Sequence, residues 1–162
     1  MAKKRFDLSD ETSCLPANVV ALDAFRLRTA VRQPKPHTLF YLTDTCRWLP
    51  ILSSFPFLQI DAITSMLMLK SKLLSHAPDL ILVESKVGWE KPVTLIETLT
   101  GLLDVPVVMI YSARDLKKVP DLLKNAFAVG MHDTLSTPLK RDELWEALDV
   151  LLKYRRQQSL TP

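Results

Sequence analysis

From residue 37 onward, short apolar runs alternate with longer stretches of helical periodicity, and this alternation constrains the fold of the chain more than any other feature. The apolar runs predict five β-strands, at Thr38–Thr43, Gln59–Thr64, Leu80–Val83, Val105–Tyr111 and Met131–Ser136. The periodic stretches predict five helices, at residues 46–55, 65–76, 92–103, 120–129 and 139–155. Ser65 is the expected N-cap of the second of these helices. Strands that alternate with helices form a parallel sheet with helices on both faces. The sequence therefore predicts an α/β fold with a doubly wound, five-stranded parallel sheet.

The first 36 residues have a different character and read as an extension. They hold seven Lys and Arg against four Asp and Glu, whereas residues 37–162 hold fourteen of each, so the whole net charge of +3 lies in this segment. An apolar face at helical spacing predicts one amphipathic helix here, built from Val20, Ala24, Leu27 and Val31. We expect an N-terminal extension at 1–36, a domain at 37–155 and a C-terminal tail at 156–162. The helix either covers the domain or meets a second protomer or another protein.

Composition excludes several classes of function. The chain of 162 residues has three glycines, which is too few for a dinucleotide fingerprint or a phosphate-binding P-loop. The small basic excess lies outside the predicted domain, so we expect no nucleic-acid partner. The three histidines fall in separate elements without the spacing of a zinc site, and we expect no metal and no cofactor.

The sequence also indicates the cellular compartment of the protein. Charged residues follow the first methionine where a signal peptide would carry an apolar run, and the longest apolar stretches are too short to span a bilayer. The two cysteines, Cys14 and Cys46, lie in different segments. We therefore expect a cytoplasmic protein without a membrane association.

Three motifs, in order along the second half of the chain, carry a family resemblance. The first is Pro78-Asp79 before the apolar run that ends at Glu84, and the second is Pro106 opening a run that ends in Ser112-Ala113. The third is the stretch from Gly130 to Leu144, which reads GMHDTLSTPLKRDEL. Over residues 37–155 the chain resembles the receiver domain of bacterial two-component response regulators, in a degenerate form. The resemblance implies a flavodoxin-like fold.

The resemblance also assigns the family's working positions to this chain. It places the phospho-accepting residue at Glu84 and the acidic pair that holds Mg²⁺ at Thr43 and Asp44. The phosphate-pairing lysine falls at Thr137, and the hydroxyl and aromatic switch positions fall at Ser112 and Thr134. The site has thus lost most of its groups, since Asp44 and Ser112 alone are of the family's type.

These replacements change the expected chemistry. The Glu84 carboxylate stands one methylene farther from the backbone than an aspartate carboxylate, and in-line phosphoryl transfer depends on sub-ångström placement. One aspartate with a displaced glutamate should bind Mg²⁺ poorly, because the ion demands near-octahedral oxygen geometry. Without an ammonium group at Thr137, the transferred charge has no fixed counter-ion. Glu84 and Asp44 are either solvated carboxylates or a frozen imitation of the activated state.

The leading hypothesis is therefore a non-enzymatic pseudo-receiver that acts by phosphorylation-independent protein–protein contact, with another protein or in a homodimer. The family's usual output surface implies Phe127, Leu135 and Trp145 as contact residues. Trp145 lies off the inward stripe of the last predicted helix, where it is either a contact anchor or half-buried at the edge of the stripe. Two alternatives stay open: Mg²⁺-dependent phosphorylation of Glu84, and a flavodoxin-like domain that binds a small ligand at the carboxyl ends of its strands.

Overall fold

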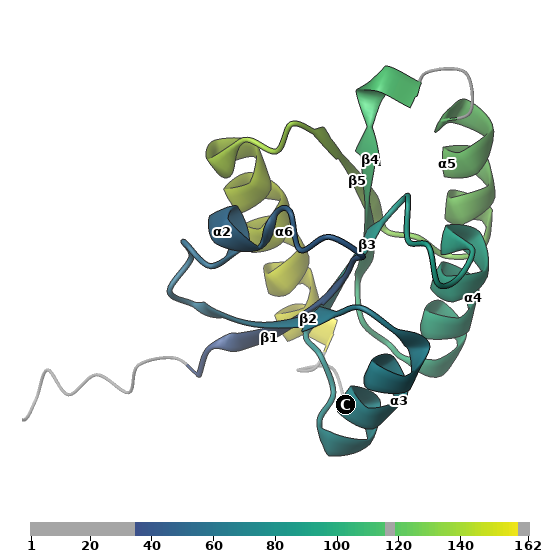
Figure 1. Cartoon of the computed structure of the whole chain (residues 1–162). Helices are drawn as coiled ribbons and strands as arrows, with labels where there is room; N and C mark the ends of the chain where they lie inside the picture. The colour runs from purple at the N-terminus through teal and green to yellow at the C-terminus, as the bar shows by residue number, and fades with distance from the viewer. Residues whose placement is uncertain (1–34, 116–118, 159–162) are drawn as a thin grey trace, which may run out of the picture. The chain divides into compact units, whose positions relative to one another are not determined.

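The computed structural model describes residues 35–115 and 119–158 (Figure 1). Its strands are β1 (His37–Leu42), β2 (Leu58–Ile63), β3 (Leu80–Glu84), β4 (Val107–Ser112) and β5 (Asp133–Thr137). They form one sheet in the order β2-β1-β3-β4-β5, and every neighbouring pair is parallel. The predicted five-stranded parallel sheet is confirmed. The predicted N-terminal helix lies outside the described residues.

Helices cover both faces of this sheet, as predicted. They are α2 (Leu49–Leu52), α3 (Met66–Ser75), α4 (Pro92–Leu102), α5 (Val119–Ala128) and α6 (Arg141–Gln158), and a short 3₁₀ turn, η1 (Ala113–Asp115), follows β4. In Figure 1, α3, α4 and α5 stand on one side of the sheet, and α2 and α6 stand on the other. None of the described helices is long and apolar enough to cross a membrane.

Each face of the sheet has its own hydrophobic core, because successive side chains of a strand point to opposite faces. On one face, Phe40 and Val83 pack with Ile96 of α4. On the other, Tyr41 and Leu82 belong to the core that holds the apolar stripe of α6. That stripe is Leu144, Leu148 and Leu152, all buried. Burial of each leucine stabilises the fold by about 1.5–3 kcal/mol relative to leaving it exposed.

The first helix after β1 is shorter than the predicted stretch of residues 46–55. The hydroxyl of Thr43 accepts the backbone N–H groups of Thr45 and Cys46, each at 3.1 Å, and Cys46 has a left-handed φ of 51°. This turn delays the helix, because a side chain that satisfies the backbone competes with helical hydrogen bonds. Pro50 then falls in the first turn, where a missing N–H costs nothing.

Other element boundaries agree closely with the sequence patterns. Ser65 caps α3 as predicted, since its hydroxyl accepts the backbone N–H of Met68 at 3.2 Å. The last helix, α6, continues to Gln158, three residues beyond the predicted end at residue 155. The compact unit that contains the sheet begins at Pro36.

Candidate functional site

The carboxyl ends of β1, β3, β4 and β5 meet at one edge of the sheet, because all of these strands run in the same direction. A cleft of about 240 Å³ opens at this edge. We call it the strand-end cleft. Its described lining residues are Thr45, Arg47, Trp48, Glu84, Ser85, Lys86, Ile110, Tyr111, Ser112 and Thr137.

The register of the sheet explains why three of the predicted site residues line this cleft. Glu84 pairs with Ile110, and Ser112, two residues farther along the same strand, pairs with Thr137. Paired residues and residues two apart share one face of a parallel sheet. Glu84, Ser112 and Thr137 therefore share the face that carries α2 and α6.

The carboxylate of Glu84 is already hydrogen-bonded inside the protein. The hydroxyl of Tyr41, which lies wholly buried on β1, donates a hydrogen bond to Oε1 of Glu84. The same hydroxyl oxygen accepts the backbone N–H of Trp48 at 3.3 Å. One oxygen at the family's phospho-accepting position is thus held by the core of the domain.

Burial keeps Tyr41 in its protonated, hydrogen-donating form. Desolvation of the buried ring raises the pKa of Tyr41 above its ordinary value, and the hydrogen bond to the Glu84 carboxylate raises it further. The neutral hydroxyl therefore remains protonated and able to donate to Glu84 at physiological pH.

Thr43 and Asp44, the two predicted site residues that follow β1, are not among the residues that line the strand-end cleft. Thr43 is fully buried, and its hydroxyl serves the turn that leads to α2. The exposed Asp44 carboxylate accepts the backbone N–H of Gly88 at 2.5 Å, which ties the β1–α2 loop to the β3–α4 loop. A Cβ atom at residue 88 would stand 2.7 Å from that carboxylate oxygen, so a larger residue here would push the Asp44 side chain out of this contact.

These residues do not fit a magnesium ion. Mg²⁺ is usually held by one or two carboxylates with space for its waters. Here the Asp44 carboxylate is bonded to Gly88 and the Glu84 carboxylate to Tyr41. Within residues 35–115 and 119–158, no group of three His, Cys, Asp or Glu side chains is placed to hold a metal.

Thr134 does not join the other predicted site residues. It pairs with Met109 in the middle of β4, three residues before the end of β5. Thr137 lies three positions after Thr134 on the same strand, so their side chains point to opposite faces of the sheet. Thr134 therefore lies away from the strand-end cleft.

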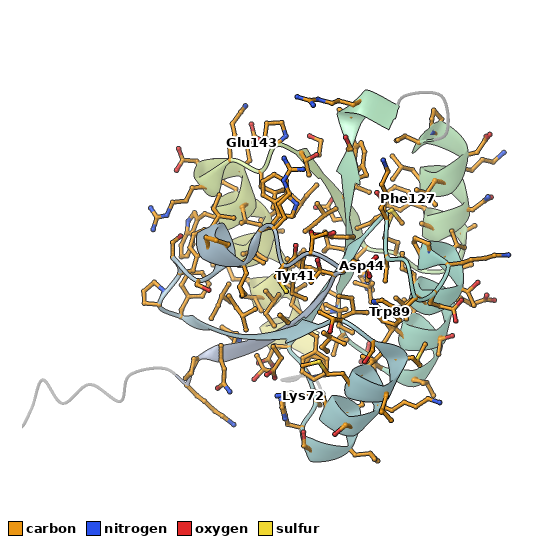
Figure 2. The ribbon with its side chains drawn as sticks, in the orientation of Figure 1. Tyr41, Asp44, Lys72, Trp89, Phe127 and Glu143 are labelled. Carbon is orange, nitrogen blue, oxygen red and sulfur yellow. The ribbon has the colours of Figure 1, made fainter. Side chains whose placement is uncertain are left out.

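One of the three predicted contact residues is not exposed, and this corrects the sequence-based prediction for that residue. Leu135 is buried in the core beneath α6, so it offers no exposed contact. Phe127 is 48% exposed on α5, and Trp145 is 43% exposed on α6. Figure 2 shows Phe127 on α5 and Glu143, at the start of α6, on opposite sides of the sheet. The periodicity of a helix fixes its inward stripe but not which neighbour lies beside the stripe.

Trp145 instead belongs to an aromatic surface. Its ring stacks on Phe55 at a centroid distance of 5.9 Å and meets Phe57 edge-on at 4.7 Å. The Arg141 guanidinium lies 5.2 Å from the centroid of Phe55. These side chains border a hollow of about 370 Å³, which we call the aromatic hollow; it is lined by Phe55, Pro56, Phe57, Arg141, Asp142 and Trp145.

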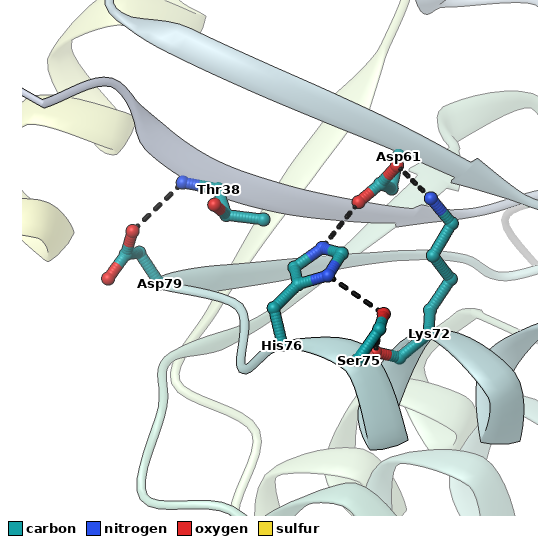
Figure 3. A network of polar contacts seen from close by, with 6 residues as sticks. All are labelled: Thr38, Asp61, Lys72, Ser75, His76 and Asp79. Carbon is teal, nitrogen blue, oxygen red and sulfur yellow. Dashed lines mark hydrogen bonds and ion pairs between the residues drawn. The ribbon is translucent and has the colours of Figure 1, made fainter.

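A second polar cluster occupies the edge strand β2 (Figure 3). Asp61 accepts hydrogen bonds from Nζ of Lys72 at 2.7 Å and from Nε2 of His76 at 2.8 Å. Nδ1 of His76 lies 2.9 Å from the Ser75 hydroxyl. Burial alone would raise the pKa of Asp61, but the hydrogen bonds from Lys72 and His76 outweigh it and lower this pKa below its ordinary value. The cluster ties the end of α3 to the sheet.

Sequence reasoning missed Tyr41, the residue that engages Glu84. A signal was present, because a buried tyrosine needs a partner for its hydroxyl, and Tyr41 stands in a run of apolar residues. Arg47, Ser85 and Lys86 were also missed. They follow β1 and β3 within five residues of each strand end, where the parallel topology brings them to the same edge.

Comparison with solved structures identifies proteins that share this fold. No protein-family model and no curated protein matches the sequence. A response regulator from Thermotoga maritima superposes with a TM-score of 0.63 at 18% identity, over 73% of this chain and 98% of that one. A two-component response regulator from Clostridium difficile gives 0.60 at 20% identity, over 72% and 96%. The receiver domain of the Francisella response regulator 1452 gives 0.59 at 16% identity, over 74% and 98%.

The chain therefore has the fold of a response-regulator receiver domain, as the three sequence motifs predicted. The likeness spans almost the whole of each of these structures.

Proposed function

We propose that this chain is a signalling module of the receiver fold that acts by contact with another protein, independently of its own phosphorylation and without enzymatic activity. The observation that carries the proposal is the hydrogen bond between the buried Tyr41 hydroxyl and Glu84. A phospho-accepting carboxylate must present a free oxygen in line with the phosphoryl donor. At this position the core of the domain already holds one oxygen.

The surroundings of Glu84 support the same conclusion. Thr137 lines the cleft where the resemblance would place an ammonium group, and a hydroxyl supplies no counter-charge to a transferred phosphoryl group. The only carboxylate of the family's type, Asp44, is engaged by Gly88. Phosphorylation would therefore have to compete with the hydrogen bond from Gly88 to Asp44 and with that from Tyr41 to Glu84.

The aromatic hollow supports the contact half of the proposal. A tryptophan, two phenylalanines and an arginine are gathered at one surface, and Trp, Tyr and Arg are the residues that most often anchor protein interfaces. Partial burial against Phe55 and Phe57 holds the Trp145 ring in place, which lowers the entropy lost when a partner covers it.

Intact-mass measurement tests the first half. The protein is incubated with acetyl phosphate and Mg²⁺, beside the Glu84→Gln and Tyr41→Phe variants and a receiver known to accept phosphate. We expect the wild-type mass to stay unchanged while the control receiver gains one phosphoryl group. One adduct on the wild type that is lost in Glu84→Gln would show that Glu84 is an acceptor and would refute the proposal. An adduct on Tyr41→Phe alone would identify Tyr41 as the block.

Sedimentation tests the second half. If Trp145 anchors a homodimer, Trp145→Ala should weaken association by on the order of 2 kcal/mol. Leu74→Ala is the control, because it removes a large exposed apolar side chain from α3, outside the aromatic hollow. Equal sedimentation of all three proteins, with no loss of a binding partner in Trp145→Ala, would remove the aromatic hollow as a contact surface.

A further inference from the structure

The outer edge of β2 is open. β2 stands first in the strand order β2-β1-β3-β4-β5, so β1 pairs with one side of it. Within residues 35–115 and 119–158, no strand lies along its other side. The backbone N–H and C=O groups on an open edge need partners, and they form a template onto which another strand can pair.

The hydrogen bonds between β2 and β1 identify the groups on this edge. The carbonyls of Phe57 and Ile63 accept backbone N–H groups from residues at the two ends of β1, at 2.8 and 3.0 Å. In a parallel ladder, every second residue of a strand bonds to the same neighbouring strand. The odd-numbered residues of β2 therefore bond to β1. The residues whose backbone groups point outward are Leu58, Ile60 and Ala62.

These outward groups are complementary to a second copy of themselves. Leu58 already donates its N–H to the carbonyl of Phe55 at 3.1 Å, whereas the other outward groups have no hydrogen bond among the described residues. Consider two copies of β2 that run antiparallel about a two-fold axis at Ile60. The two Ile60 residues then exchange both of their hydrogen bonds, and each Ala62 N–H meets the Leu58 carbonyl of the other copy. This register uses the open groups and spares the N–H that is already bonded.

The side chains of β2 fit the same register. Ile60 is half-buried on the face that carries α2 and α6, and it would stand opposite its counterpart. On the same face, Leu58 would stand opposite Ala62, which places a large side chain beside a small one. On the α3 face, the exposed Gln59 would stand opposite Asp61, and its amide can donate to this carboxylate. Both faces of the paired strands are therefore compatible with the hydrogen-bond pattern.

β2 also lacks the features that commonly protect an open edge, namely proline, lysine, a bulge or an unpaired charge. Its six residues read LQIDAI and pair with β1 without a bulge. Its one charged side chain, Asp61, is bonded by Lys72 and His76 on the α3 side (Figure 3). Phe57, which lines the aromatic hollow, directly precedes the strand, so apolar surface continues from the hollow to this edge. The strand itself therefore does not oppose pairing.

We propose that two copies of this chain pair through antiparallel β2 strands about a two-fold axis at Ile60, which joins their sheets into one continuous sheet. Residues 37–162 hold fourteen basic and fourteen acidic residues, so two such domains meet without net repulsion. A two-fold contact uses the same edge of both copies and closes, so the assembly stops at a dimer. The contact is made by the β2 backbone, so this inference does not depend on the function proposed above for the aromatic hollow.

Charges placed at the two-fold axis give the sharpest variants. Ile60→Lys and Ile60→Glu each set two like charges opposite one another, which should weaken self-association by about tenfold or more. An equimolar mixture of the two variants should associate again, because opposite charges then face each other. Ile60→Thr is the matched control, since it keeps the β-branched shape without a charge, and it should weaken association clearly less. Ala62→Pro removes an outward N–H but no hydrogen bond to β1, and it should abolish the dimer.

Sedimentation equilibrium of the full chain at about 1–500 μM measures association, and circular dichroism checks that each variant is folded. We expect a wild-type dimer, and hydrogen exchange should show protection of the Ile60 and Ala62 amides that falls on dilution. A monomeric wild type would overturn the proposal, and so would a mixture of folded Ile60→Lys and Ile60→Glu that fails to associate. Protection of both amides in a monomer would also overturn it, because another part of the same chain would then cover the edge. A dimer that is lost in Trp145→Ala but unaffected by the β2 variants would assign the interface to the aromatic hollow instead.

Discussion

Glu84 and Asp61 stand on the two strands that flank β1, and both carboxylates accept hydrogen bonds, but from opposite kinds of donor. Asp61 is bonded by the side chains of Lys72 and His76, both carried on or next to α3. Glu84 is bonded by the neutral, buried hydroxyl of Tyr41. In the Asp61 arrangement, opposite charges can pair within the protein. The second gives the Glu84 carboxylate a neutral donor, so this contact leaves its negative charge uncompensated beside the strand-end cleft.

This difference teaches how the surroundings of a carboxylate set its role. Asp61 joins a helix to an edge strand, and its ionised form is favoured by its neighbours, which suits a structural contact (Figure 3). Glu84 has its position fixed by the core while its charge still acts on whatever enters the cleft. Three substitutions can break or sharpen this comparison.

The largest effect is expected at Tyr41. Tyr41→Phe keeps the buried ring but removes the donor to Glu84 and the acceptor of the Trp48 N–H. We expect the free energy of unfolding to fall by about 2 kcal/mol, because hydrogen bonds to charged groups contribute about 1.5–3 kcal/mol. Urea denaturation measures this change.

The control for this substitution is Tyr111→Phe, since Tyr111 lines the same cleft but is only half-buried. Tyr111→Phe should lower the free energy of unfolding clearly less than Tyr41→Phe does. In a double-mutant cycle with Glu84→Gln, the two residues should show a coupling of about 1 kcal/mol or more. Strict additivity of the two substitutions would contradict the contact.

A smaller effect is expected at Asp61, and it should depend on pH. Asp61→Asn removes a charge that is bonded by Lys72 and His76, at a partly exposed site, so we expect a loss of about 1 kcal/mol at pH 7. Because the pKa of Asp61 is lowered in the folded state, its contribution is complete above the ordinary carboxylate pKa of about 4. The contribution disappears as the pH falls through the lowered pKa.

Urea denaturation of wild type and Asp61→Asn between pH 3 and 7 checks the sign. The two stability curves should converge toward low pH. The control is Asp104→Asn, which changes an exposed carboxylate outside the cluster and should leave a curve parallel to that of the wild type. A gap between wild type and Asp61→Asn that widened on acidification would refute the assignment.

The smallest effect is expected at the loop contact of Asp44. Gly88→Ala would place a methyl group 2.7 Å from the Asp44 carboxylate oxygen, so this flexible, exposed side chain must leave the Gly88 N–H. We expect a loss of less than about 1 kcal/mol, because water can replace the lost partner. Gly101→Ala is the opposite control. Nothing lies within 4 Å of a Cβ there, and alanine in α4 should raise stability by about 0.5–1 kcal/mol.

Much of the fold followed from local pattern. The alternation of apolar runs and helical stretches predicted the parallel sheet and helices on both faces, and Ser65 predicted the start of α3. The start of α3 depends on an interaction between residues close in sequence. The sheet and its covering helices depend on the repeated alternation of strands and helices. The shortened helix after β1 was harder to predict, because the Thr43 hydroxyl reorganises the following turn through contacts that residue types alone do not reveal.

The sequence by itself determined that Glu84, Ser112 and Thr137 would reach one edge of the sheet, since parallel strands end at the same side and each of these residues is the last of its strand. Only the tertiary structure decided what surrounds them. The hydroxyl of Tyr41 meets Glu84 across 43 residues of chain, and Trp145 meets Phe55 and Phe57 across three α-helices and four strands. Such contacts depend on the register and twist of the whole sheet, because these set which side chains of distant segments come within hydrogen-bonding or packing distance.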